Sequence, residues 1–399
     1  MDMKDMVAQL AAEKDRIRQM GGEAKIEKQH GRGKLTARER LALLFDDEAF
    51  FEVGILGTQM GPWGKDKPAA DAVICGIGEV NGRMVASAAY DFTVKGGSIG
   101  HVGEIKVTRL REMALRCRMP MVWFIDSAGA RIDPMGQDPD MISTFAGTGY
   151  LFQEEVIMSG VVPLVSAMVG PGAAGTAYIP GLADFVPMVK KIGSMALAGP
   201  PLVKAVTGET IDEEALGGSK VHTTISGVGD VEVKNDAACV EMIKDYLSYM
   251  PSHCKEKPPI IPCDDPVDRA DDELLEIVPP EQRKPYDMYR ILERVVDHGR
   301  YLDIKPKWAK PIITCLSRIG GYPCGIVANN PRQTGGVLDG DCADKAAHFM
   351  QICDAFNIPL IFFQDVPGFM VGQRVEHAGI IRHGAKMLHV MASATVPKL

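Results

Sequence analysis

The feature that most constrains this fold is an internal repeat, found by comparing the chain with itself. Glycine, proline and aspartate markers recur in the same order at a constant offset of 239 residues (321 minus 82, and likewise 368 minus 129). A gapless match of this kind predicts two copies of one structural unit. The first copy carries Gly82, Gly96, Gly97, Pro120, Asp126 and Gly129, and the second carries Gly321, Gly335, Gly336, Pro359, Asp365 and Gly368.

Each copy shows the same order of elements. Strand patterns at 71–80 and 83–90 flank Asn81-Gly82, which is a type I′ hairpin signal. Helical spacing follows over 96–118, and 121–125 is continuously apolar, as in a strand buried on both faces. The second copy runs from a strand at 325–328 through a helix near 342–357 to a strand at 360–363. Repeated ββαβ units predict an α/β fold with chemistry in the loops after the strands.

Other segments organise the chain around these copies. A helical leader is expected at 4–20, and 61–68 is expected to form an exposed loop. The polar, proline-rich stretch 251–284 is typical of a linker. We therefore expect an N-terminal domain at 1–250 and a C-terminal domain at 285–399.

Two loops of small residues are candidates for chemistry. A buried strand is expected at 161–169, followed by the loop 170–178, and the first copy ends at 126–131. If the two strands are parallel, both loops lie at the same end of the sheet and can present backbone N–H groups to one developing oxyanion. The alternative for such a glycine-rich loop is a tight packing contact between helix and strand.

No protein nucleophile or metal ligand set is evident. The chain has no Ser/His/Asp arrangement, no phosphate-binding loop and no His/Cys/Asp cluster with metal-ligand spacing. We expect Asp126 and Asp365 to cap helices. His383 and His389, near Arg382 and Lys386, are expected to be solvated charges on a helix.

Composition excludes several classes of function. The net charge is −8, which argues against nucleic acid or an anionic membrane surface as a partner. Nine cysteines without a Cys-x-x-Cys pair are typical of reduced, mostly buried thiols. The N-terminus lacks an apolar signal core and no run is long enough to span a membrane, so we expect a cytoplasmic protein.

Several stretches resemble the acyl-CoA carboxyltransferase family, in particular the β subunits of propionyl-CoA carboxylase and related enzymes. The resemblance covers essentially the whole chain and implies two tandem crotonase-like domains of repeated ββαβ units. The stretches that carry it are Ile26-Glu-Lys-Gln-His-Gly-Arg-Gly-Lys-Leu-Thr-Ala-Arg-Glu-Arg40, Asp126-Ser-Ala-Gly-Ala-Arg131, Val206-Thr-Gly-Glu with Glu213-Glu-Ala-Leu-Gly-Gly218, Asp365-Val-Pro-Gly-Phe-Met-Val-Gly372 and Gly379-Ile-Ile-Arg-His-Gly-Ala-Lys386.

The resemblance implies a biotin-dependent enzyme of fatty acid or propionate metabolism, with no metal in this subunit. An acyl-CoA binds mainly to the N-terminal domain, and carboxybiotin on a carrier protein binds to the C-terminal domain of a neighbouring subunit. Carboxybiotin releases CO₂, and biotin then removes the α proton of the thioester, so the cofactor is its own base. The protein has to stabilise two oxyanions.

Site residues follow from the resemblance by position. The oxyanion donors on the acyl-CoA side are Gly129, Ala130, Ala174 and Gly175, and those on the biotin side are Gly368 and Phe369. The family usually has Gly-Gly where this chain has Ala174-Gly175, so Ala174 is a departure. Contacts to CoA are expected from Arg131, Ala128 and Gly172.

The resemblance also implies partners: a biotin carboxyl carrier protein or biotin carboxylase subunit, and further copies of this chain in a hexamer. The counterpart of Pro163 is Pro397, which places the second copy's small-residue loop near position 408, beyond Leu399. We therefore expect an incomplete second domain. Three alternatives stay open: the carboxyltransferase subunit of a biotin-dependent decarboxylase, a crotonase-type hydrolase or isomerase that does not use biotin, and an inactive assembly subunit. The acyl group and the direction of transfer are not determined.

Overall fold

The computed structural model describes residues 2–46, 50–58, 67–131, 151–266, 268–281 and 284–399. The chain divides into two compact units: Met1–Val221 with Glu232–Lys244, and His222–Val231 with Asp245–Leu399. Most of the loop expected at 61–68 lies outside the described residues. The segment 251–284 contains one short helix, α12 (Leu274–Ile277), among its described residues and otherwise no helix or strand.

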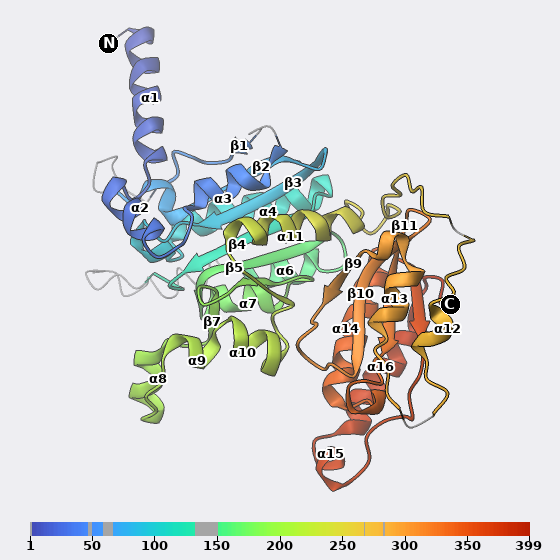
Figure 1. Ribbon diagram of the computed structural model, residues 1–399. Coiled ribbons are helices and arrows are strands. Elements are labelled where there is room, and N and C mark those ends of the chain that lie inside the picture. The colour runs from blue at the N-terminus through green and yellow to red at the C-terminus, as the bar shows by residue number, and fades with distance from the viewer. Residues whose placement is uncertain (1, 47–49, 59–66, 132–150, 267, 282–283) are drawn as a thin grey trace. The chain divides into compact units, whose positions relative to one another are not determined.

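The first unit begins with helices and continues into a sheet (Figure 1). The expected leader helix is confirmed as α1 (Met3–Arg18), which starts at a capping box formed by Asp2 and Asp5. The other helices are α2 (Glu23–His30), α3 (Ala37–Leu44), α4 (His101–Cys117), α6 (Leu151–Met158), α7 (Gly175–Gly181), α8 (Pro200–Thr207), α9 (Glu213–Gly217), α10 (Ser219–Val221) and α11 (Asp236–Tyr249), which continues past Lys244.

The larger sheet has eight strands in the order β1-β2-β3-β4-β5-β6-β8, with β7 also paired to β5. β2 and β3 form the expected antiparallel hairpin, and the turn residues Asn81 and Gly82 have φ of 51° and 70°, as a type I′ turn requires. β3, β4 and β5 are parallel. The strands are β1 (Phe50–Glu52), β2 (Val73–Val80), β3 (Arg83–Tyr90), β4 (Met121–Ser127), β5 (Leu164–Ala173), β6 (Pro187–Val189), β7 (Ser194–Ala196) and β8 (Val231–Val233).

The second unit carries a smaller sheet in the order β12-β11-β10-β9, in which only β11 and β12 are parallel. Its strands are β9 (Tyr301–Ile304), β10 (Ile312–Ile319), β11 (Tyr322–Asn329) and β12 (Leu360–Phe363). Its helices, besides α12, are α13 (Tyr289–Val295), α14 (Gly340–Ala355), α15 (Gln373–His377) and α16 (Ile380–Ser393).

Three expected boundaries differ from the structure. The first copy's helix begins at His101 rather than at Gly96, because Lys95, Gly96 and Gly97 all have φ near +50° to +65°, which an α-helix does not tolerate. The second copy's helix spans Gly340–Ala355 rather than 342–357. β5 continues through Ala173, inside the segment expected to be a loop, because Pro171–Ala173 pairs with β7.

The internal repeat is confirmed at the level of single hydrogen bonds. The main chain of Ile99 bridges Ala130, with N–H···O distances of 2.8 Å (Ile99 to Gly129) and 3.0 Å (Arg131 to Ile99). The residues 239 positions later repeat this: Leu338 bridges Phe369, with distances of 3.1 Å (Leu338 to Gly368) and 2.7 Å (Met370 to Leu338). The predicted correspondence of Pro163 and Pro397 also holds, since their carbonyls accept from Met121 and Leu360.

Each unit has its own hydrophobic core. In the first unit, Trp123, Ile125 and Met168 from the central strands pack with Val107 and Leu110 of α4, and all five are fully buried. A buried side chain of this size contributes about 1.5–3 kcal/mol through lost apolar surface. The rigid strands β4 and β5 therefore hold the loops that follow them.

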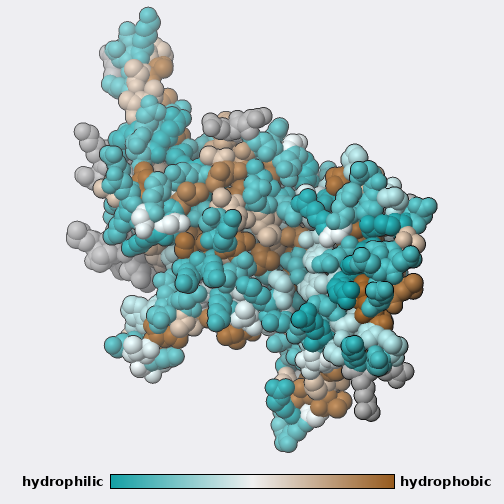
Figure 2. Space-filling model, in the orientation of Figure 1, coloured by the Kyte–Doolittle hydropathy of each residue, from teal (hydrophilic) through white to brown (hydrophobic). Residues whose placement is uncertain are grey.

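The face drawn in Figure 2 is largely hydrophilic, with scattered hydrophobic areas. Leu202 and Val206 on α8 are 56% and 75% exposed. Among the described residues, no helix combines the length and apolar character needed to cross a membrane. All nine cysteines are free thiols and six of them are buried, as expected from their spacing.

Candidate active site

The loops after β4 and β5 lie side by side at one end of the sheet. The two strands are parallel, and Ser127 at the end of β4 is level with Gly172 near the end of β5. A side chain at Gly129 would place its Cβ 2.8 Å from the Ala173 carbonyl oxygen, and Gly129 has φ of 89°. Only glycine therefore allows the two loops to come this close. The expected juxtaposition is confirmed.

The four expected donors on these loops are not equivalent. The Gly129 N–H donates to Ser127 Oγ at 3.1 Å, and the Ala174 N–H donates to the Ala196 carbonyl at 3.1 Å. These two groups already have acceptors, contrary to what their position in the loops suggested. The N–H groups of Ala130 and Gly175 have no acceptor among the described residues. The role of either group in binding a ligand stays a prediction.

Ile99 contacts both Ala130 and the surroundings of Gly175, the residues that carry these two N–H groups. Its main chain forms the bridge to Ala130, and its side chain lies 4.0 Å from where a Cβ would stand at Gly175. Leu151 and Phe152 of α6 are the other neighbours of Gly175, at 3.8 and 3.9 Å. One side of the site is therefore apolar, which strengthens hydrogen bonds to a developing charge.

The residues expected to contact CoA occupy different settings. Ala128 is exposed, whereas Gly172 is buried inside β5. Arg131 already has partners within the protein. Its guanidinium pairs with Asp71 and donates to Ser98 Oγ at 3.1 Å and to the Ser98 carbonyl at 2.9 Å. Contact of these residues with CoA stays a prediction.

The second unit presents the corresponding turn at Gly368 and Phe369. Gly368 has φ of 132°, and a Cβ there would meet nothing within 4 Å, so the turn is open to approach. Because the bridge to Leu338 uses the N–H of Leu338 and of Met370, the Phe369 N–H points away from it and has no acceptor among the described residues. Its part in catalysis is likewise a prediction.

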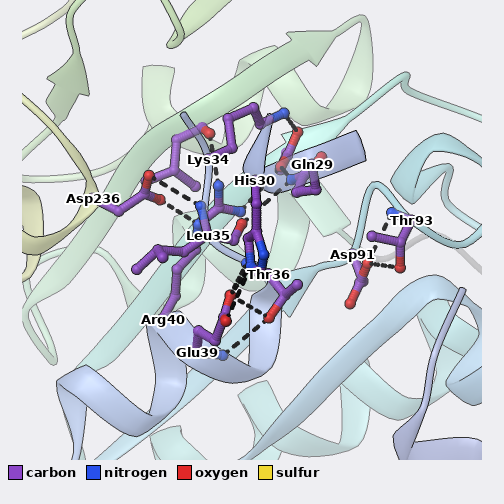
Figure 3. A network of polar contacts seen from close by, with 12 residues as sticks. Gln29, His30, Lys34, Leu35, Thr36, Glu39, Arg40, Asp91, Thr93 and Asp236 are labelled. Carbon is purple, nitrogen blue, oxygen red and sulfur yellow. Dashed lines mark hydrogen bonds and ion pairs between the residues drawn. The ribbon is translucent and has the colours of Figure 1, made fainter. Parts of the chain in front are cut away.

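Asp126 is not a helix cap, and this expectation was wrong. Its carboxylate is fully buried and accepts from Gln29 Nε2 at 2.8 Å, from Lys34 Nζ at 2.6 Å and from Arg40 at 3.0 Å. Figure 3 shows Gln29, Lys34 and Arg40 in this cluster. Arg40 also pairs with Asp236 and donates to the Val169 carbonyl at 3.0 Å. This buried polar cluster connects the N-terminal helices to β4, the strand that precedes the first of the two small-residue loops.

The electrostatics of the cluster follow from its burial. Burial lowers the pKa of Lys34, and the attraction of Asp126 opposes that shift. Two cations face two carboxylates, which compensates the charges that burial would otherwise make very unfavourable. The sequence contained this signal in the stretch 26–40, but its basic residues gave no sign of which acid they would meet.

Asp365 also does not cap a helix. It is exposed and accepts from the Tyr286 hydroxyl at 2.8 Å, and burial together with this contact raises the pKa of Tyr286 to about 12. On α16, His383 and Lys386 are more engaged than expected, since both pair with Asp344, at 2.8 and 3.1 Å. Among the described residues, no three His, Cys, Asp or Glu side chains are placed to hold a metal ion.

Comparison with known proteins defines the family. The family profile described as "Carboxyl transferase domain" matches residues 28–399. The methylmalonyl-CoA decarboxylase subunit alpha of Veillonella parvula is 41% identical over 387 residues, covering 96% of this chain and 75% of that protein. The human mitochondrial propionyl-CoA carboxylase beta chain is 42% identical over 384 residues, covering 95% of this chain and 70% of that protein.

A solved structure agrees with these relatives. The crystal structure of transcarboxylase 12S, described as a hexamer with methylmalonyl-coenzyme A and methylmalonic acid bound, matches with a TM-score of 0.94 at 41% identity. The match covers all of this chain and 77% of that one. The chain therefore belongs to the carboxyl transferase family, and it is a crotonase-fold carboxyltransferase of the biotin-dependent acyl-CoA carboxylases.

Proposed function

We propose that this chain transfers a carboxyl group between carboxybiotin, carried by a partner protein, and the α carbon of an acyl-CoA bound at the first unit. The observation that carries the proposal is the pair of N–H groups at Ala130 and Gly175, which have no acceptor among the described residues. They stand on adjacent loops at the carboxyl ends of parallel strands, where α/β sheets bind ligands.

These groups suit a thioester that loses its α proton. The thioester oxygen, on which negative charge develops, accepts hydrogen bonds from both N–H groups. Loss of one such donor typically raises the activation free energy by about 3–4 kcal/mol. The side chains of Ile99, Leu151 and Phe152 make one side of this position apolar. Carboxybiotin supplies the carboxyl group and, once it has lost it, the base, so no histidine or glutamate of the protein needs to act.

The second unit is proposed to bind biotin at Gly368 and Phe369. The Phe369 N–H, which has no acceptor among the described residues, fits the ureido oxygen of biotin, and the open space above Gly368 admits a ring. We assign the first unit to the acyl-CoA side and the second unit to the biotin side on this basis.

For the substrate, we propose the pair propionyl-CoA and methylmalonyl-CoA, because relatives at 41–42% identity are named for these thioesters. The partner is a biotin carboxyl carrier protein. We also propose a homo-oligomer, supported by exposed apolar side chains such as Phe152 and Val156 on α6 and Val206 on α8. Contacts of Ala128 and Gly172 with CoA, and the cellular compartment, stay predictions.

A decarboxylase complex is the second candidate context. The relative from Veillonella parvula is a methylmalonyl-CoA decarboxylase subunit, and its identity to this chain is as high as that of the carboxylase chains. Both contexts use the same transfer step run in opposite directions. The proposal therefore covers the transfer itself and leaves its direction to the partner proteins.

The proposal can be tested with methylmalonyl-CoA and free biotin as the acceptor. We expect the wild-type chain to consume methylmalonyl-CoA only when biotin is present. Gly175→Pro removes the candidate N–H at the first residue of α7, where the helix does not use it, whereas Gly175→Ala retains it and meets only ordinary contacts of 3.8–4.0 Å. We expect kcat to fall about 10²- to 10³-fold for the proline variant and less than about threefold for alanine.

Three results would contradict the proposal. Turnover that is equally fast without biotin points to a crotonase-type reaction. Absence of turnover with biotin indicates that the chain lacks this activity. Equal kcat values for the proline and alanine variants remove the role of the Gly175 N–H.

A further inference from the structure

We propose that Asp71 and Arg131 are positioning residues that hold the Ala130 N–H in place, so that Arg131 acts on the loop rather than on CoA. The proposal rests on the function proposed above for Ala130. Asp71 lies just before β2 and Arg131 directly follows Ala130, and the two side chains form an ion pair. Asp71 is 1% exposed and the Arg131 side chain 16%.

The ion pair fits into a gap left by a glycine. A Cβ at Gly100 would lie 2.4 Å from both the Arg131 guanidinium and the Asp71 carboxylate, so a larger residue there would separate them. The second carboxylate oxygen of Asp71 accepts from the Gly103 N–H at 2.7 Å, in the first turn of α4. Asp71 therefore joins Arg131 to a rigid helix.

Arg131 forms hydrogen bonds with the segment that faces Ala130. Its Nε and a terminal nitrogen donate to the Ser98 hydroxyl and carbonyl, and its main-chain N–H donates to the Ile99 carbonyl. All three guanidinium nitrogens thus have acceptors within the protein. Because Ile99 is also the bridge partner of Ala130, these bonds set the direction of the Ala130 N–H.

The backbone that presents Asp71 is strained. Ala70, Asp71 and Ala72 have φ of 48°, 49° and 64°, a left-handed conformation that is unfavourable for residues other than glycine. The buried Lys106 holds this turn by donating to the carbonyls of Ala70 at 2.8 Å and Val73 at 2.7 Å. Strain of this kind persists where the surroundings over-determine it, often at functional sites.

The internal repeat shows that the fold does not need the ion pair. Lys345 stands 239 residues after Lys106 and likewise donates to main-chain carbonyls, including Ile312 at 2.8 Å. The bridge between Leu338 and Phe369 is also present. At the positions of Asp71 and Arg131, however, the second copy has Lys310 and Met370. The ion pair is therefore present at the loop after β4 and not at the corresponding loop of the second copy. This difference indicates that the ion pair serves the chemistry of the loop after β4.

Steady-state kinetics separate positioning from CoA binding. The variants are Asp71→Asn, Arg131→Met, which installs the residue of the second copy, and the double variant. Misplacing a reacting group by about 1 Å costs roughly 10²-fold. We expect each single variant to lower kcat about 10- to 100-fold with KM changed less than about threefold, and the double variant to match the single ones. The same losses are expected with a methylmalonyl-pantetheine thioester, which lacks the nucleotide phosphates.

Two kinetic results would overturn the proposal. An Arg131→Met variant that raises KM for the CoA thioester but not for the pantetheine thioester shows a phosphate contact instead. Losses in kcat that multiply in the double variant show that the two residues act separately.

Hydrogen exchange tests the same idea without catalysis. In the free protein, we expect Asp71→Asn and Arg131→Met to speed amide exchange about tenfold in a peptide covering 127–131. A peptide covering 366–370 serves as the internal reference, and Lys310→Met, an exposed residue at the position matching Asp71, is the control variant. Unchanged exchange at 127–131 overturns the proposal. Because this readout needs no turnover, it distinguishes failure of the positioning role from failure of the proposed function.

Discussion

Removal of Arg40 is expected to be among the most damaging single changes in the first unit. The side chain is fully buried and donates to Asp126 and the Val169 carbonyl, both at 3.0 Å, and to Asp236 (Figure 3). Arg40→Met preserves the apolar stem and removes the charge. The two carboxylates that it served then remain in the interior with fewer partners.

The magnitude follows from what each carboxylate retains. Asp126 still has Lys34 and Gln29, at 2.6 and 2.8 Å. Among the described residues, Asp236 retains one long hydrogen bond, from the Leu35 N–H at 3.4 Å. Breaking a buried ion pair by removing one partner costs about 3–5 kcal/mol, because the other charge stays buried. Lys34→Met is the matched control, and since Asp126 retains Arg40 there, its cost should be about 1–3 kcal/mol.

Thermal unfolding followed by circular dichroism measures the difference. For a unit of this size, 1 kcal/mol shifts Tm by about 2–4 °C, so Arg40→Met should lower Tm by about 6–20 °C and Lys34→Met by about 2–12 °C. A loss below about 3 °C for Arg40→Met, or a larger loss for Lys34→Met, would refute this account of the cluster.

Two further changes test other parts of the first unit. Glu155 is fully buried 3.9 Å from Arg111, and burial raises its pKa from 4.5 to about 7. Between these two pH values the folded protein binds one proton more than the unfolded chain. The free energy of unfolding therefore falls by up to about 3 kcal/mol as pH rises through this range. The Tm advantage of Glu155→Gln over wild type should therefore grow by several degrees from pH 5 to pH 8, and a constant difference would contradict the assignment. Ala174 has φ of 51° and ψ of −116°, a conformation that suits glycine. Ala174→Gly should therefore raise the free energy of unfolding, measured in urea, by about 1 kcal/mol without lowering kcat. A loss of stability would show that the residue is not strained there.

Local patterns predicted the parts of the structure that depend on neighbours in the chain. The hairpin at Asn81-Gly82 and the buried strand at 121–125 follow from turn chemistry and apolar runs, which act over a few residues. The error at the start of α4 arose because Lys95–Gly97 have positive φ and precede the helix, since periodicity does not report backbone conformation. The carboxyltransferase assignment came from the resemblance of whole stretches and not from periodicity.

The order of the residues was enough to show that the chain repeats one ββαβ unit, since the constant spacing of 239 residues is a property of order alone. It also placed the two small-residue loops at the ends of strands. Which N–H groups in those loops lack an acceptor among the described residues depends on the tertiary structure, because Ala174 finds its acceptor at Ala196 on a neighbouring strand. The tertiary structure likewise decided that Asp126 meets Lys34, 92 residues away, and that Arg131 is held by Asp71. Contacts between residues so far apart depend on how strands and helices pack, which no local pattern encodes.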